Sequence, residues 1–232
     1  MKDSKVVERL TPTKGGEWLT EQFLAIYNLA VPYVKGKTIL DAGCGTGLGC
    51  STLLEAGAND IEAFDISEKA LRFARKNFGS KRIVFKKADF EKDKFPLSKY
   101  DIAISIEVIE HIKNYRFYLD NIALSLKNKG LLFLTTPNAP KPFYNNPYHL
   151  RYFTDKEVCL LLKEANFKVI KTWTVSINNF SLYTPILIPV SIISTIKKSR
   201  FYPYLIKLFY RPKVKEGDTS GETMFFLARR YE

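Results

Sequence analysis

The chain has 232 residues, a formal net charge of +12 and three cysteines, Cys44, Cys50 and Cys159, none in CxxC spacing. This length suits one α/β domain, and the cysteine pattern excludes a disulfide framework and a structural zinc site, so no metal is expected. The positive charge favours a polyanionic partner such as nucleic acid, anionic lipid headgroups or a phosphorylated substrate.

The hydrophobic pattern predicts helices and strands in alternation along the chain. We expect helices over residues 17–33, 46–56, 68–78, 114–127 and 155–165. We expect strands over residues 37–41, 61–64, 82–87, 100–106, 130–135, 168–174 and 223–228. Ser67 and Thr154 are good N-caps for the helices that follow them. Strands alternating with helices indicate an α/β fold with a mostly parallel sheet and right-handed crossovers.

Residues 1–232 are expected to form a single domain with two additions. Residues 1–36 would be an N-terminal helical cap, and residues 176–218 an insertion between the last two strands. The insertion mixes apolar residues with basic and aromatic ones, which suits an active-site cap, a segment facing an anionic membrane, or a dimer contact. A cytoplasmic protein, with peripheral membrane attachment as an option, is expected because residues 1–10 are charged and no apolar run is long enough to span a bilayer.

A glycine-rich turn follows the first predicted strand. Its three glycines are Gly43, Gly45 and Gly47. They allow a tight turn and leave room for a ligand, and the following helix directs free N–H groups at it. The spacing fails the dinucleotide pattern G-x-G-x-x-G, because Leu48 occupies the third position. Asp41, at the head of the turn, suits the ammonium of an amino-acid moiety instead, and Asp65, after the second strand, suits the hydroxyls of a ribose.

Five stretches in this order resemble the motifs of the class I S-adenosylmethionine-dependent methyltransferases. They are residues 40–47, 64–67, 87–90, 100–112 and 126–138. The resemblance implies a Rossmann-like fold, with a seven-stranded, mostly parallel sheet, an antiparallel closing strand and helices on both faces. It also implies S-adenosylmethionine as the cofactor and S-adenosylhomocysteine as the product.

The resemblance further implies which residues contact the methionine half of the cofactor. Asp41, Gly43 and Gly45 would line the methionine moiety. Ile106 and Glu107, just past the fourth strand, would border the sulfonium centre.

The adenosine half has its own implied contacts. Asp65 would hold the ribose hydroxyls, and Ile66 would lie against one face of the adenine. Asp89 would accept a hydrogen bond from the adenine amino group, with the backbone or ring of Phe90 beside it. For Asp89 and Phe90, a turn cap and a core residue are the alternative interpretations.

The chain has two histidines, and both follow predicted strands at the edge where an open α/β sheet binds ligands. His149 lies in a stretch that resembles the H-x-x-x-F-T segment of ubiquinone-biosynthesis-type O-methyltransferases, and we prefer it as general base for a hydroxyl nucleophile. His111 is the second candidate, with a structural hydrogen bond as its alternative role. Neither need act as a base if the acceptor is an amine or a carbon acid.

The residues after the fourth strand bear on the acceptor. Residues 105–108 read SIEV rather than the N/D-P-P-Y/F tetrad of amino-methylating enzymes, and no cysteine lies where cytosine C5 chemistry needs one. We therefore expect methyl transfer, at oxygen, to a small-molecule or lipid/isoprenoid-linked acceptor. An RNA methyltransferase and a non-catalytic cofactor-binding protein remain as alternatives.

Overall fold

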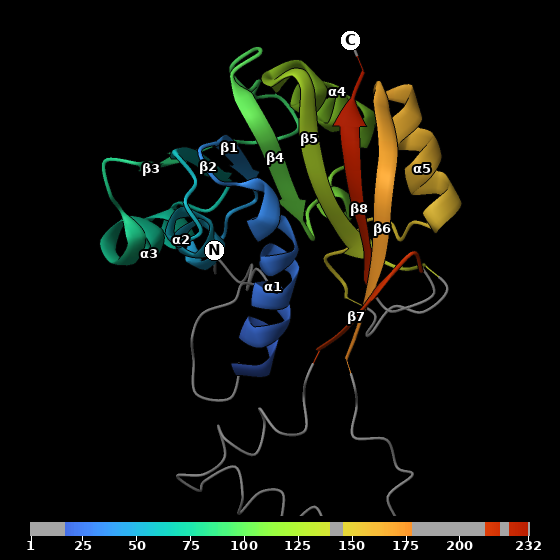
Figure 1. The fold of residues 1–232 in the computed structure, drawn as a ribbon, viewed down its shortest axis with the longest axis horizontal. Helices are drawn as coiled ribbons and strands as arrows, with labels where there is room; N and C mark the ends of the chain where they lie inside the picture. Colours follow the sequence, from blue (N-terminus) through green and yellow to red (C-terminus); the bar gives the residue numbers. More distant parts are fainter. Residues whose placement is uncertain (1–16, 140–145, 178–211, 219–222, 232) are drawn as a thin grey trace, which may run out of the picture.

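The computed structural model describes residues 17–139, 146–177, 212–218 and 223–231 (Figure 1). The helices are α1 Glu17–Ala30, α2 Leu48–Glu55, α3 Glu68–Phe78, α4 Tyr115–Ser125 and α5 Asp155–Glu164, with the 3-10 turns η1 Val31–Tyr33 and η2 Ile109–His111. The strands are β1 Thr38–Ala42, β2 Asp60–Asp65, β3 Ile83–Lys87, β4 Tyr100–Ile106, β5 Leu126–Pro137, β6 Phe167–Ile177, β7 Pro212–Glu216 and β8 Thr223–Arg230.

The strands form one sheet in the order β3-β2-β1-β4-β5-β8-β6-β7. β1 to β5 are mutually parallel, whereas β8 runs antiparallel to both of its neighbours, β5 and β6. The strand order reverses between β1 and β4, and ligands of such sheets bind outside the carboxyl ends of the strands at this switch point. The predicted fold class is confirmed.

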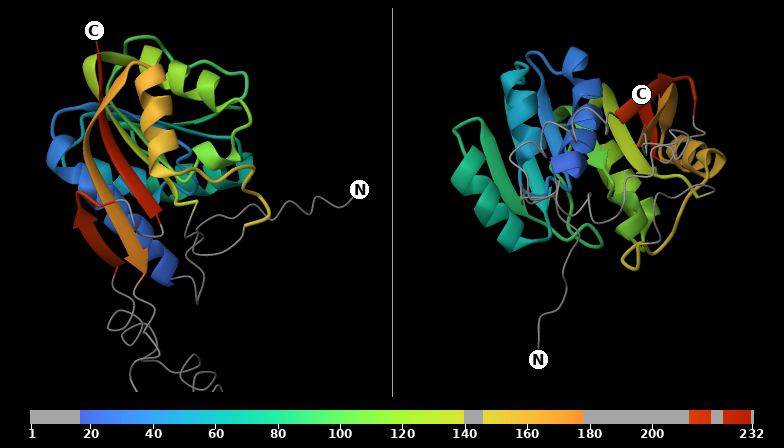
Figure 2. Two further views of the ribbon diagram at one scale, coloured as in Figure 1. Left: turned by 90° about the vertical axis from the view of Figure 1, so that its right-hand side faces the viewer. Right: turned by 90° about the horizontal axis from the view of Figure 1, so that it is seen from below.

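Helices cover both faces of the sheet (Figure 2). α1, α2 and α3 pack on one face, where their apolar residues share a core with inward-facing residues of the strands. α4 and α5 pack on the other face in a second core. β1 and β4 are buried on both faces, which is why apolar residues predominate in both strands and do not alternate with exposed polar ones.

Local sequence explains where several elements begin. The hydroxyl of Ser67 accepts a hydrogen bond from the Ala70 N–H, and Thr154 and Glu157 form a capping box at the start of α5. Both predicted N-caps are therefore confirmed. α2 begins at Leu48 rather than at Thr46, because Gly47 has a left-handed backbone conformation that cannot lie inside a helix.

The sheet has one strand more than the seven predicted. β7 lies inside the predicted insertion and pairs antiparallel with β6 from Trp173↔Glu216 to Ile177↔Pro212. Its proline, at the start of the strand, and its alternating lysines suit an edge strand. The two ends of the insertion are therefore paired strands, and residues 178–211 of it lie outside the described residues, as do residues 1–16 of the predicted cap.

Within the described residues, no helix combines the length and the apolar character needed to cross a membrane.

Candidate active site

The glycine-rich turn connects β1 to α2 and is hydrogen-bonded to the end of β2. The N–H groups of Gly43 and Cys44 both donate to the carbonyl of Phe64, at 2.8 and 3.0 Å. Gly43 has φ +95°, and a Cβ placed there would lie 2.3 Å from the Val108 side chain. A Cβ placed on Gly45 would instead meet no atom within 4 Å. The turn thus packs against the segment after β4 at Gly43 and has open space at Gly45.

Asp41 is fully buried in β1, on the side of the sheet covered by α1 and α2. Its Oδ2 accepts hydrogen bonds from the Tyr27 hydroxyl and the Cys50 thiol, each at 3.1 Å. Burial raises the pKa of this carboxyl to about 6, against the opposing effect of the two hydrogen bonds and with a smaller contribution from the charge of Asp65. Asp41 therefore titrates close to neutrality.

Asp65 ends β2 and holds the glycine-rich turn. Its Oδ2 accepts from the Gly45 N–H at 2.9 Å, and its Oδ1 accepts from the Ser67 N–H at 2.8 Å. The next residue, Ile66, is 55% exposed although it is large and apolar. An anchored carboxylate beside an exposed apolar side chain combines the polar and apolar groups that small-molecule sites use.

Asp89 follows β3 at the same edge of the sheet. It accepts a hydrogen bond from the Glu91 N–H at 3.1 Å and forms an ion pair with Lys92 at 3.2 Å, and these interactions lower the pKa of its carboxyl. The ring of Phe90 is buried between the rings of Phe95 and Tyr118. Phe90 is thus a core residue, and its backbone is the part that could lie beside a ligand.

Ile106 ends β4 and is buried, and Glu107 follows it with φ +54°. This left-handed conformation is costly for a residue with a Cβ and occurs often at functional sites. Thr135 of β5 holds it in place, because its hydroxyl donates to Glu107 Oε1 at 2.9 Å and also accepts from the Glu107 N–H at 3.1 Å.

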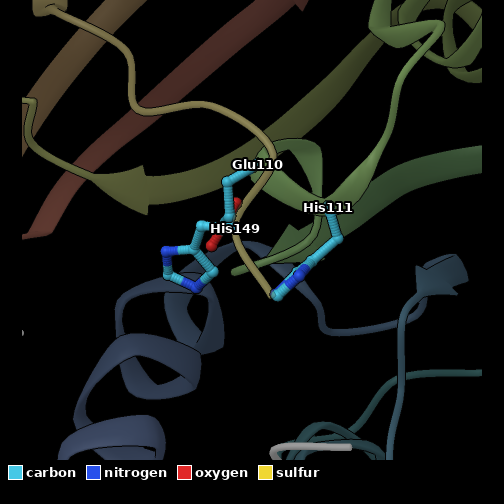
Figure 3. Close-up of side chains that lie close together, drawn as sticks. All are labelled: Glu110, His111 and His149. Atoms are coloured by element: carbon cyan, nitrogen blue, oxygen red, sulfur yellow. The ribbon is translucent and has the colours of Figure 1, made fainter. Parts of the chain in front are cut away.

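The structure brings both histidines together. The rings of His111, at the end of η2, and His149, in the loop after β5, are 4.7 Å apart between centroids in an edge-to-face arrangement. Burial, and then the charge of His111, lower the pKa of His149 to about 4, so its imidazole is neutral at pH 7. Figure 3 shows both rings beside the carboxylate of Glu110, which is fully buried.

Several residues at this edge were not predicted to have a role. Tyr27 contacts Asp41, while Thr135 and Thr136 hold Glu107 and Glu110. The two threonines could have been found, because they are consecutive polar residues directly after the apolar run of residues 131–134. The Tyr27 contact joins segments 14 residues apart and has no local sequence signature.

Residues 17–172 match the sequence profile of a family described as a methyltransferase domain. The match covers more than half of the chain, and the chain belongs to this methyltransferase family.

Curated relatives of known name agree with this assignment. The chain is 29% identical over 147 residues to a probable S-adenosylmethionine-dependent methyltransferase of Mycobacterium tuberculosis, covering 61% of this chain and 53% of the relative. It is 30% identical over 146 residues to a ubiquinone biosynthesis O-methyltransferase of Rickettsia bellii, covering 60% and 56%. The chain thus spans little more than half the length of these relatives.

Solved structures share the fold. An S-adenosylmethionine-dependent methyltransferase from Mesorhizobium loti superimposes with a TM-score of 0.61 at 19% identity, covering 90% of this chain and 98% of that one. A methyltransferase from Thermotoga maritima superimposes with a TM-score of 0.64 at 17% identity, covering 92% and 93%. The family implies S-adenosylmethionine as cofactor, and the residues present fit it, because the turn is open at Gly45 and Asp65 is anchored beside the exposed Ile66.

Proposed function

We propose that the chain transfers a methyl group from S-adenosylmethionine to an oxygen atom of a small-molecule or lipid-linked acceptor. The observation that carries the proposal is the meeting of His111 and His149 at the carboxyl edge of the sheet, next to the segment that packs on the glycine-rich turn. The 30% identity to a ubiquinone biosynthesis O-methyltransferase supports an oxygen acceptor.

The proposed cofactor contacts follow the ends of the strands. Asp65 and Ile66 would hold the ribose and the adenine, with Asp89 at the amino group of the base and the Phe90 backbone beside it. Gly43, Gly45 and Gly47 would form the turn that receives the methionine half of the cofactor, with open space at Gly45, and Asp41 would attract its ammonium. Ile106 and Glu107 would lie beside the sulfonium.

When bound, the cofactor supplies a methyl group on a positively charged sulfur, which is already an activated leaving group. The contribution of the protein is to align the acceptor oxygen with the methyl group and to exclude water, which can be worth several kcal/mol. A hydroxyl acceptor must also lose its proton, and His149 and His111 are the groups at this edge through which we propose that the protein promotes that loss.

The test is an incubation of the protein with methyl-labelled S-adenosylmethionine and a host-cell extract, followed by solvent partition and by treatment of the product with hot hydriodic acid, which releases an oxygen-bound methyl group as volatile methyl iodide. Volatile label from the product of wild-type protein, but not of Asp65→Ala, is the expected result. Label in the organic phase would identify a lipid-linked acceptor, and label in the aqueous phase a water-soluble one. Label confined to RNA or protein would refute the proposal.

A further inference from the structure

Glu110, His111 and His149 form a cluster of metal-ligand type at the carboxyl edge of the sheet. Each offers one ligand atom, and the three atoms lie within 4.8 Å of one another, the one such group in the part of the chain that the structure describes. Glu110 is fully buried and both histidines are half-buried, so the cluster remains partly exposed to solvent. Two imidazoles and one carboxylate are the donor set of a catalytic zinc site, which keeps one position open.

The hydrogen bonds around the cluster determine which atom of a side chain would bind a metal ion. Nδ1 of His111 lies 3.0 Å from the carbonyl oxygen of Tyr148. A carbonyl can only accept, so a neutral His111 carries its proton on Nδ1 and has its lone pair on Nε2. Metal-bound histidines are usually held in this way, with the second ring nitrogen donating to a backbone carbonyl. Thr136 similarly donates to Glu110 Oε2, at 3.2 Å.

The two segments that supply the ligands are fastened to each other. The Leu150 N–H donates to the carbonyl of Glu110 at 2.8 Å. In the loop that carries His149, Asn146 accepts from the Tyr148 N–H through its side chain and from the His149 N–H through its backbone, at 2.9 and 3.1 Å. The cluster is therefore largely pre-organised, as a binding site must be.

The spacing is compatible with one ion. Ligand atoms about 2.1 Å from a zinc ion lie roughly 3.4 Å apart in a tetrahedron, so the three groups would have to approach by at most about 1.4 Å. Small rotations of the Glu110 and histidine side chains are enough for this, because terminal torsions of such groups have broad minima.

We propose that Glu110, His111 and His149 bind one divalent first-row transition metal ion with an open coordination position. The prediction that no metal is present rested on cysteine spacing, which does not bear on a histidine and carboxylate site. The donor set favours Zn²⁺, Co²⁺ or Mn²⁺ over Mg²⁺ or Ca²⁺, which prefer oxygen ligands.

The role of the ion rests on the proposed function. The acceptor hydroxyl would occupy the open position, and coordination would lower its pKa so that its proton leaves to solvent. The oxygen lone pair then forms the new O–CH₃ bond while the S–CH₃ bond breaks and its electron pair stays on sulfur. The metal is neither oxidised nor reduced, and both histidines act as ligands rather than as bases.

The test measures metal binding to the full chain, freed of any affinity tag and stripped with a chelator. Titration with Zn²⁺ and with Co²⁺ is followed by calorimetry and visible absorption. We expect one equivalent to bind to wild-type protein, with the weak d–d bands of nitrogen and oxygen coordination. Intense thiolate-to-cobalt charge-transfer bands would place the ion on cysteines and overturn the proposal.

Variants locate the site. Glu110→Gln and His149→Ala should each weaken binding by at least about 100-fold, more than loss of an outer hydrogen bond does. Thr136→Val, which removes the hydroxyl that holds Glu110, should weaken binding by about tenfold, whereas the neighbouring Thr135→Val should not change it. Circular dichroism and cofactor affinity report whether each variant is folded. Equal metal affinity in folded wild-type, Glu110→Gln and His149→Ala proteins would refute the site.

The role is tested separately, by repeating the label assay with the chelated protein before and after addition of one equivalent of Zn²⁺ or Mn²⁺. Transfer that stops on chelation and returns with the ion, at unchanged cofactor affinity, supports the role. Full transfer by metal-free protein would refute the metal's role while leaving the proposed methyl transfer intact. Metal binding without methyl transfer to any acceptor would refute the proposed function while leaving the metal site intact.

Discussion

Tyr27 of α1 donates its hydroxyl to the buried carboxylate of Asp41 in β1, with 3.1 Å between the two oxygens. The ring of Tyr27 also covers Gly49 so closely that a Cβ on that glycine would lie 2.0 Å from it. The helix before the first strand therefore packs on the same side of the molecule as the start of the glycine-rich turn, because its Tyr27 covers both Asp41 and Gly49.

The pKa of Asp41 predicts how cofactor affinity depends on pH. Since burial raises this pKa to about 6, the carboxyl is largely protonated at pH 5 and largely ionised at pH 7. The cofactor's ammonium favours the ionised form, so affinity should rise by about tenfold between these values. Calorimetric titrations with S-adenosylmethionine at both pH values test this, and an equally steep rise in Asp41→Asn would assign it to another group.

The same group makes a prediction about folding stability. A folded-state pKa above the unfolded value near 3.8 means that the native protein binds more protons between pH 3.8 and 6. Asp41 therefore lowers the free energy of unfolding as pH rises through this window, by up to about 3 kcal/mol in total. Urea denaturation should show this loss in wild-type protein and not in Asp41→Asn. Parallel pH profiles of the two proteins would contradict it.

Asp65 predicts a large effect on cofactor binding. Asp65→Ala removes the carboxylate that accepts from Gly45 and Ser67, and with it the proposed ribose contact. Loss of a charged hydrogen-bond acceptor should weaken S-adenosylmethionine binding by about 100-fold. The matched control is Asp60→Ala, at the exposed amino end of the same strand, which should leave affinity unchanged. Similar affinities of the two variants would remove Asp65 from the site.

The sequence predicts the parts of this molecule that are encoded locally. The positions of Asp65 and Ser67 follow from a strand end and an N-cap, and the order of the motifs predicts the sheet. The Tyr27–Asp41 contact could not be predicted, because it depends on how α1 packs across the sheet. β7 was missed for a similar reason, since a short Lys-rich segment after a long intervening stretch becomes a strand only by pairing with β6.

The histidines also combine a position that the sequence predicts with a contact that depends on packing. Their place after the fourth and fifth strands was predicted from motif order, but the 4.7 Å contact between their rings was not. Glu110 lies next to His111 in the sequence, yet its complete burial arises from the packing of η2 on β5 through Thr136. Adjacency in sequence therefore identified the segment but not the cluster.

Gly43 predicts a steric effect on stability. Gly43→Ala would force a Cβ against Val108 in addition to the cost of its positive φ, whereas Gly36→Ala has a positive φ of +71° and open space around it. We expect Gly36→Ala to lose about 1 kcal/mol of unfolding free energy and Gly43→Ala about 2 kcal/mol more. Chemical denaturation measures both. The double variant Gly43→Ala/Val108→Ala should recover part of the extra loss, and no recovery would show that Val108 is not the obstacle.

Glu107 predicts that backbone strain and cofactor binding are linked. Both Glu107 and Lys129 have left-handed backbones, at φ +54° and +61°, but Lys129 lies in β5 near its amino end, away from the site. Lys129→Gly should stabilise the fold by about 1 kcal/mol with unchanged cofactor affinity, because glycine adopts this conformation without strain.

Glu107→Gly should stabilise the fold by less, since this variant also loses the hydrogen bond with Thr135, worth about 1 kcal/mol. If Glu107 borders the sulfonium, its variant should bind S-adenosylmethionine about tenfold more weakly, because it loses a nearby negative charge. Denaturation curves and calorimetry of the two variants separate these effects, and equal cofactor affinity in both would place Glu107 outside the cofactor site.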